Sequence, residues 1–149
     1  MNRLEHVNLV AVDIDATCLF IQTAFPDWKI RGQGENDWYG SKRRWMHIGT
    51  DDWYLTLNAG NSDDNRDLRG NSPGLAHIGF VVDNVEKITE RLTKGRYQIA
   101  TLGADHPYRK TVYFVDPSGF EFEFIQYLSE TVHEKNMYGG ETSLITRFI

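Results

Sequence analysis

The stretches "LEHVNLVAVD" (residues 4–13) and "LAHIGFVVD" (residues 75–83) open the two halves of the chain in nearly the same way. In each, a histidine follows a leucine by two positions, an apolar run comes next, and an aspartate ends the run. Apolar runs rich in β-branched residues are typical of strands. Each run is followed by a segment with helical periodicity. The repetition therefore predicts one module that occurs twice.

The elements after each opening strand have the same order. In the first half, a strand is expected at 4–12 and a helix at 13–25, which ends before a proline. Three strands follow, around 29–31 and at 44–49 and 53–58. In the second half, the corresponding strand, helix and three strands are expected at 75–83, 84–95, 97–101, 109–116 and 120–127. Only two copies of so long a period indicate a duplicated βαβββ module rather than a solenoid.

We therefore expect an α+β fold in which two βαβββ modules, at 4–59 and 75–127, form a curled mixed sheet around a cleft with the helices outside. The polar segment 60–74 predicts a linker, and residues 128–149 predict a tail that packs against the body or a partner subunit. All 149 residues are expected to form a single domain.

Composition excludes several classes of function. A net charge of −5 argues against a nucleic-acid partner, which usually meets a basic surface. No apolar run has the roughly 20 residues that cross a membrane. The first residues do not have the layout of a signal peptide, so a cytoplasmic protein is expected. The single cysteine, Cys18, excludes an internal disulfide and lies at helical spacing from apolar residues, as a core thiol does.

Alternation along the strands predicts which side chains face the cleft. In the strand at 75–83, the bulky residues occupy the helix-facing positions and leave His77 toward the cleft, and the repeat gives His6 the equivalent place. In "FEFEF" (120–124), the phenylalanines share one face, which leaves Glu121 and Glu123 on the other. Two histidines and a carboxylate in one cleft are typical of sites for iron and related divalent metals.

Each of these residues also has a plainer interpretation. A single histidine is more often a core or surface residue than a metal ligand. Alternating glutamates often lie on the solvent-exposed face of an edge strand. The duplication favours the metal site because it places His6 and His77 on equivalent strands. His47, His106 and His133 have no partner in the repeat, so no site role is predicted for them.

The chain resembles the vicinal oxygen chelate superfamily, which includes glyoxalase I, extradiol dioxygenases and the fosfomycin- and bleomycin-resistance proteins. The resemblance covers residues 4–126 and is carried by "LEHVNL" (4–9), "LAHIGFVVD" (75–83) and above all "VYFVDPSGFEFEF" (112–124). It implies the paired-module fold stated above. It also implies that the site is a cleft, often built across a homodimer.

The resemblance implies His6, His77 and Glu123 as metal ligands, with Glu121 as a second carboxylate in the cleft. Members with four protein ligands have another carboxylate where this chain has Thr56, so the two-histidine, two-glutamate set of glyoxalase I is incomplete here. Three ligands instead resemble those of the extradiol dioxygenases and the fosfomycin-resistance transferases. Tyr113 matches a tyrosine that helps to bind or deprotonate substrate in the dioxygenases.

Two functions from different classes follow. The first is a metal-dependent enzyme, a lyase, isomerase or dioxygenase, in which a divalent ion (Fe, Mn, Zn or Ni) chelates adjacent oxygens of a small-molecule substrate. Glu121 or Tyr113 moves a proton, and Thr56 and Arg109 contact the substrate. The second is a metal-free protein of the bleomycin-sequestering type, with an aromatic cleft supplied by Trp38, Tyr39, Trp45, Trp53 and Tyr54. We expect a homodimer, and the sequence leaves open whether the modules pair within a chain or across two.

Overall fold

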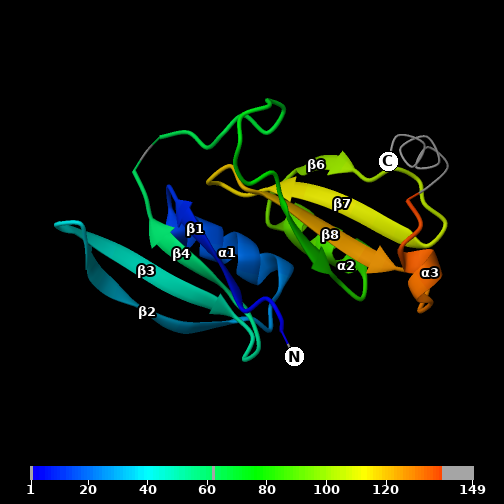
Figure 1. Cartoon of the computed structure of the whole chain (residues 1–149), viewed down its shortest axis with the longest axis horizontal. Helices are drawn as coiled ribbons and strands as arrows, with labels where there is room; N and C mark the ends of the chain where they lie inside the picture. Colours follow the sequence, from blue (N-terminus) through cyan, green and yellow to red (C-terminus); the bar gives the residue numbers. More distant parts are fainter. Residues whose placement is uncertain (1, 62, 139–149) are drawn as a thin grey trace.

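The computed structural model describes residues 2–61 and 63–138 and confirms the α+β fold (Figure 1). Each half contributes one four-stranded mixed sheet. The elements of the first half are β1 (His6–Ala11), α1 (Ile14–Ala24), β2 (Lys29–Trp38), β3 (Ser41–Gly49) and β4 (Tyr54–Ala59). Those of the second half are β5 (Ile78–Val81), α2 (Val85–Lys94), β6 (Ile99–Leu102), β7 (Arg109–Val115) and β8 (Glu121–Tyr127), followed by the short α3 (Val132–Lys135).

The two sheets have the same topology. Their strand orders are β1-β4-β3-β2 and β5-β8-β7-β6, with a parallel pair at β1/β4 and β5/β8 and antiparallel pairs elsewhere. This is the order expected of a duplicated βαβββ module. Within the described residues, no hydrogen-bonded ladder joins the sheets, so they do not close into one barrel.

The helices α1 and α2 begin and end where the sequence predicts. The carboxylate of Asp13 accepts hydrogen bonds from the N–H groups of Asp15 and Ala16 at 3.0 and 2.9 Å and caps α1, which ends before Pro26. The side chain of Asn84 caps α2 in the same way, and α2 ends at Gly95. These local signals explain why the sequence predicts the helices closely.

The hairpin formed by β2 and β3 differs from expectation. A short strand around 29–31 was predicted, but β2 extends to Trp38 and pairs with β3 over nearly its whole length. Tyr39 and Gly40 form the turn, both with positive φ (52° and 83°), as tight hairpin turns require. The glycine-rich, polar sequence of β2 lacks an apolar period because this edge strand is exposed along its length.

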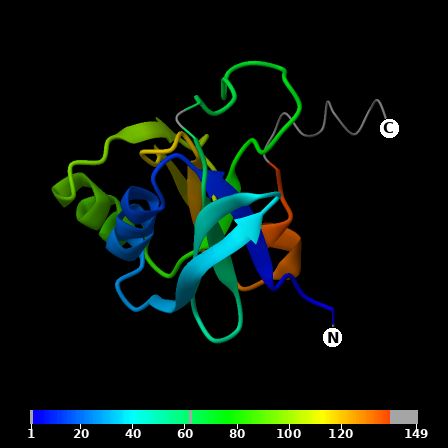
Figure 2. The same ribbon diagram turned by 90° about the vertical axis from the view of Figure 1, so that its left-hand side faces the viewer.

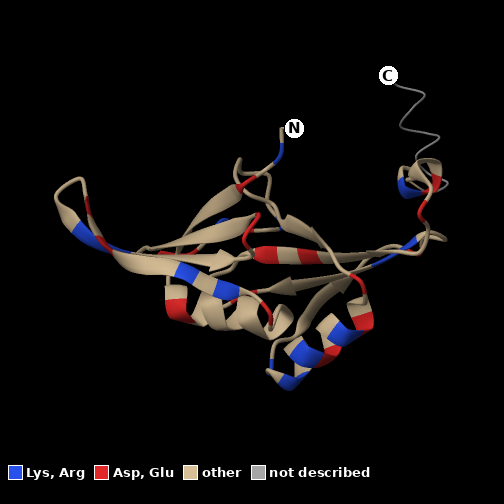
Figure 3. Ribbon diagram, turned by 90° about the horizontal axis from the view of Figure 1, so that it is seen from below, with Lys and Arg blue, Asp and Glu red and all other residues tan. Residues whose placement is uncertain are grey.

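The core lies between the sheets and the two helices, which cover the same side (Figures 2 and 3). It is continuous across the modules. The ring of Phe20 in α1 packs 5.2 Å from that of Phe122 in β8, and Phe25 packs 5.3 Å from Phe80 in β5. Cys18 is buried in this core, as predicted. Leu9 and Ala11 of β1 point into it, so His6 lies on the opposite face of the first sheet.

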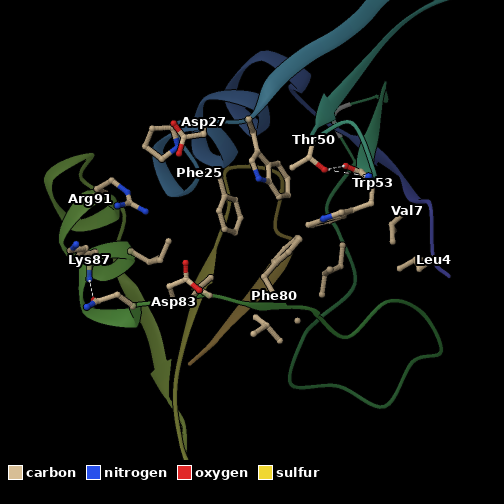
Figure 4. Close-up of a pocket in the computed structure, with 18 residues that line it drawn as sticks. Leu4, Val7, Phe25, Asp27, Thr50, Trp53, Phe80, Asp83, Lys87 and Arg91 are labelled. Atoms are coloured by element: carbon tan, nitrogen blue, oxygen red, sulfur yellow. Dashed lines mark hydrogen bonds between the residues drawn. The ribbon is translucent and has the colours of Figure 1, made fainter. Parts of the chain in front are cut away.

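The modules meet tightly on one side and loosely on the other. The start of α1 packs on the β7–β8 turn, where the Thr17 hydroxyl donates to Asp116 Oδ2 at 2.5 Å. The start of α2 does not close on the β3–β4 turn in the same way. A cavity of about 890 Å³ lies there, with Phe25, Trp28, Trp53, Phe80 and Asp83 among its lining residues (Figure 4).

None of the helices in the described part of the chain is long and apolar enough to span a membrane.

Candidate functional site

The outward face of the second sheet brings together three of the predicted site residues. His77, just before β5, has its Nε2 3.1 Å from Glu123 Oε2 on β8. The hydroxyl of Tyr113 on β7 donates to the other carboxylate oxygen, Glu123 Oε1, at 2.7 Å. The side chain of Glu123 is only 17% exposed and that of His77 is 40% exposed. Each oxygen of the Glu123 carboxylate therefore has one partner, His77 or Tyr113. A ligand can approach the carboxylate on the side of the more exposed His77.

Burial and neighbouring carboxylates keep Tyr113 in its phenol form. Partial burial raises the pKa of Tyr113, and the hydrogen bond to Glu123 and the negative charges of Glu123 and Glu121 raise it further. The positive charge of Arg109 lowers the same pKa by less. At neutral pH, Tyr113 is therefore a hydrogen-bond donor to Glu123 rather than a base.

The remaining predicted residues of this half lie on the same two strands. Glu121 opens β8 opposite Val115 and is half-buried. Arg109 opens β7, where its guanidinium lies 5.3 Å from the ring centroid of Tyr138. No contact of Arg109 with His77 or Glu123 is observed in the described residues, so it lies at the edge of the group rather than in its centre.

The outward face of the first sheet places His6 in an aromatic row. The His6 ring stacks on Tyr54 of β4 at 5.0 Å, and Tyr54 stacks on His47 of β3 at 4.8 Å. The row continues from His47 to Trp45 at 4.9 Å. His6 Nδ1 also lies 2.9 Å from Glu5 Oε2. This leaves Nε2 of His6 as the ring nitrogen without a contact to Glu5.

Thr56 lies at the position of the first module that corresponds to Glu123. Its ladder neighbours are Asn8 on β1 and His47 on β3, just as Glu123 has Gly79 on β5 and Tyr113 on β7. Thr56 is 7% exposed, so its hydroxyl lies within the face rather than above it. The correspondence that the sequence predicts between Thr56 and Glu123 therefore holds in the backbone register.

His77 and Glu123 bring an imidazole nitrogen and a carboxylate oxygen close together in the second half of the candidate site. His77 Nε2 and Glu123 Oε2 are 3.1 Å apart, the distance of an ion pair, which is also short enough for both atoms to bind one ion. His6 does not join them in the single chain. Among residues 2–61 and 63–138, no three His, Cys, Asp or Glu side chains form a group able to hold a metal. His77, Glu123 and Tyr113 are thus brought together on the second sheet, whereas His6 and Thr56 lie apart from them on the first sheet.

His47 and Arg31 belong to the same face as His6 but were not predicted. His47 lies opposite Thr56 as Tyr113 lies opposite Glu123, so it is the counterpart of Tyr113 in the repeat. Burial lowers the pKa of His47, and the positive charge of Arg31 lowers it further. The Arg31 guanidinium lies 4.2 Å from the Tyr54 ring centroid. Aligning the β3 and β7 strands by their pairing, rather than by histidine identity, would have found His47.

Comparison with known proteins places the fold in one family. The family model described as the glyoxalase/bleomycin resistance protein/dioxygenase superfamily matches residues 3–124. A search of curated proteins gave no match.

Several solved structures share the fold at low identity. A glyoxylase/bleomycin resistance protein/dioxygenase domain from Frankia sp. EAN1pec is 22% identical, with a TM-score of 0.69 over 85% of this chain and 98% of its own. The fosfomycin resistance protein FosX from Listeria monocytogenes, solved with Mn(II) and sulfate, is 19% identical, with a TM-score of 0.64 over 92% and 99%. Lactoylglutathione lyase from Agrobacterium tumefaciens is 18% identical, with a TM-score of 0.59 over 85% and 94%.

The duplicated module and its strand order agree with a family match that covers most of the chain. This protein belongs to the glyoxalase/bleomycin resistance protein/dioxygenase superfamily.

Proposed function

We propose that the protein is a metal-dependent enzyme acting on a small molecule, with a divalent ion held by His6, His77 and Glu123. The observation that carries the proposal is the 3.1 Å approach of His77 Nε2 to Glu123 Oε2, with Tyr113 holding the second carboxylate oxygen. Imidazole and carboxylate donors together suit Fe, Mn, Zn and Ni. A hydrogen bond that fixes a ligating carboxylate is typical of metal centres.

The chain's own residues supply orientation and proton transfer. A bound divalent ion would supply Lewis acidity to two adjacent oxygens of the substrate. Tyr113 keeps Glu123 in one orientation by donating to Oε1. Glu121, on the same face two residues away, accepts a proton from the substrate carbon beside those oxygens and returns it to the neighbouring atom. In this proposal, the hydroxyl of Thr56 and the guanidinium of Arg109 contact polar groups of the substrate. The reaction is that of a lyase, an isomerase or a dioxygenase.

We further propose that each complete site combines two chains. The side chains of His6 and His77 are 42% and 40% exposed, each on a sheet face that the helices do not cover. A two-fold dimer is self-complementary, so a face of one chain that meets the other face of its partner does so twice. Such a dimer joins His6 of one chain to His77 and Glu123 of the other and yields two sites.

Metal content tests the ligand set. The protein is purified without a nickel column, loaded with Mn²⁺, Fe²⁺, Zn²⁺ or Ni²⁺, and dialysed. We expect about one ion per chain and loss of that ion in His6→Ala, His77→Ala and Glu123→Ala. His133→Ala, which alters an exposed histidine of α3, is the matched control and should retain the metal. A wild type that stays metal-free with all four ions would contradict the proposal and favour a metal-free binding protein.

Mixing two defective variants tests the two-chain site. His6→Ala and Glu123→Ala homodimers each lack a ligand in both sites. After co-expression, each heterodimer has one site with both defects and one intact site, so about a quarter of the wild-type metal content should return in a random mixture. No recovery in a mixture whose chains are shown to exchange would mean that each site lies within one chain.

A further inference from the structure

Arg31 is directed onto the site face of the first sheet by an irregularity of its strand. The pairing of β2 with β3 shifts register between Ile30 and Gly32, which leaves Arg31 as an extra residue in a β-bulge. Bulges re-aim side chains and are common beside active sites. The guanidinium lies over the Tyr54 ring, and among the described residues it has no carboxylate within ion-pair distance.

Two glycines make a flat aromatic surface next to this arginine. A Cβ at Gly32 or Gly34 would lie 3.6 or 3.3 Å from the Trp45 indole, so the indole lies directly against the backbone of β2. Trp45 is only half-buried, which leaves part of the ring open on the outward face. The ring continues the row formed by His47, Tyr54 and His6. A planar group therefore has a ready stacking surface.

The charge of this face is opposite to that of the whole chain. Directly paired residues share a face, so the ladder register places on it His6, Asn8, Val10, Lys29, Gly32, Gly34, Asn36, Trp38, Ser41, Arg43, Trp45, His47, Gly49, Tyr54, Thr56 and Asn58. Arg31, in the bulge, joins this face through its contact with the Tyr54 ring. Arg31, Arg43 and Lys29 are the charged residues of this face, which has no carboxylate among these described positions, although the chain as a whole has a net charge of −5. Glu5 at the rim already contacts His6. The charge of this face therefore favours an anion.

We propose that this face binds the planar anionic part of the substrate, an aromatic carboxylate, with Arg31 as the counter-ion and Trp45 as the stacking surface. A guanidinium binds a carboxylate through two parallel hydrogen bonds and also stacks on aromatic rings, so Arg31 can do both at once. The inference rests on the proposed function only for its location beside the metal ligand His6. The binding surface itself lies within one chain.

Benzoate is a suitable probe because it has the ring and the charge but no adjacent oxygen pair for a metal. Metal-loaded protein is titrated with benzoate and with uncharged benzamide while the indole N–H signals are followed by ¹H–¹⁵N NMR. We expect benzoate to shift the Trp45 signal and to bind at least about tenfold more tightly than benzamide. Shifts confined to Trp28 and Trp53, which line the inter-module cavity, would overturn the proposal.

Three variants separate the charge from the stacking surface. Arg31→Gln should weaken benzoate binding about tenfold and leave benzamide unchanged. Gly34→Val should weaken both because the new side chain displaces the Trp45 indole. Lys42→Gln removes one positive charge from the far end of β3 and should change neither. Equal benzoate affinity in Arg31→Gln and wild type would overturn the proposal.

The outcomes for the two proposals are distinguishable because metal content is measured in every sample. Wild type that binds benzoate at Trp45 without metal would support the anionic subsite and contradict the metal enzyme. Metal-loaded wild type that does not bind benzoate would contradict the anionic subsite and would not contradict the proposed metal ligands.

Discussion

The two modules have the same strands at the candidate site and different side chains on them. In the second, Glu123 and Tyr113 face each other across the ladder and share a hydrogen bond. In the first, the same two positions hold Thr56 and His47, and the face is lined by stacked rings. One backbone thus presents carboxylate oxygen in one copy and aromatic, cationic surface in the other. In the two proposals made above, the second copy supplies the carboxylate ligand, and the first supplies His6 and the anion-binding surface.

The turns before the last strand of each module differ in the same manner. In the second module, the Asp116 carboxylate accepts from the N–H groups of Ser118 and Phe120 and from the Thr17 hydroxyl of α1. In the first, the Thr50 hydroxyl accepts from the N–H groups of Asp52 and Trp53, and no helix in the described part of the chain donates to it. The first turn faces the inter-module cavity instead. The better-packed turn is therefore the one that supports Glu123.

The largest expected effect is on stability at these turns. Asp116→Ala leaves two buried N–H groups without their acceptor and removes the closer of the two partners of the Thr17 hydroxyl, so the free energy of unfolding should fall by about 3 kcal/mol. Thr50→Ala, the corresponding change in the half-exposed turn, should cost about 1 kcal/mol. Urea denaturation followed by circular dichroism measures both. Equal losses would mean that the two turns are equally packed, contrary to the comparison.

The next effect concerns the pair that differs across the two ladders. Tyr113→Phe removes the hydrogen bond to Glu123 Oε1, so metal affinity should fall about tenfold while the fold persists. His47→Phe changes the corresponding residue of the first module, keeps a ring against Tyr54, and should leave metal affinity nearly unchanged. Isothermal titration with the metal found in the wild type measures both. A larger loss in His47→Phe would reverse the roles assigned to the two modules.

The sequence predicts those parts of the molecule that depend on local signals. Leu9 and Ala11 in β1, and Phe122 and Phe124 in β8, alternate with polar residues because each strand has one face on the core. This alternation also identified the outward faces of His77 and Glu123. The end of β2 has no such signal, because its glycines and polar residues are ordered by pairing with β3 rather than by burial.

The candidate site depends on information that a single pattern does not contain. The counterpart of Tyr113 is His47 only when β3 and β7 are aligned by their ladders, and the β2 bulge that aims Arg31 has no sequence mark of its own. The separation of His6 from the His77–Glu123 pair is a property of how the two modules pack. It depends on contacts such as that of Thr17 with Asp116, nearly a hundred residues apart.

The smallest expected effect is the pH dependence of stability, which His47 and Tyr113 should limit from opposite sides. Burial is the first cause of both shifts: it lowers the pKa of His47 and raises that of Tyr113. As pH falls through about 6.5, the ordinary histidine value, the unfolded chain gains a proton at His47 before the folded chain does. As pH rises through about 10, the unfolded chain loses the Tyr113 proton first. Stability should fall in both directions.

Variants that cannot titrate isolate each limit. Relative to wild type, His47→Gln should lose less stability between pH 7 and pH 5, and Tyr113→Phe should lose less between pH 9 and pH 11, as measured by urea midpoints at each pH. His133→Gln, which changes an exposed histidine, should follow the wild-type curve throughout. Wild-type behaviour of His47→Gln on the acid side would mean that His47 ionises freely on its sheet face. The corresponding positions of the two modules would then differ in environment as well as in side chain, because burial would disfavour the charged form of Tyr113 but not that of His47.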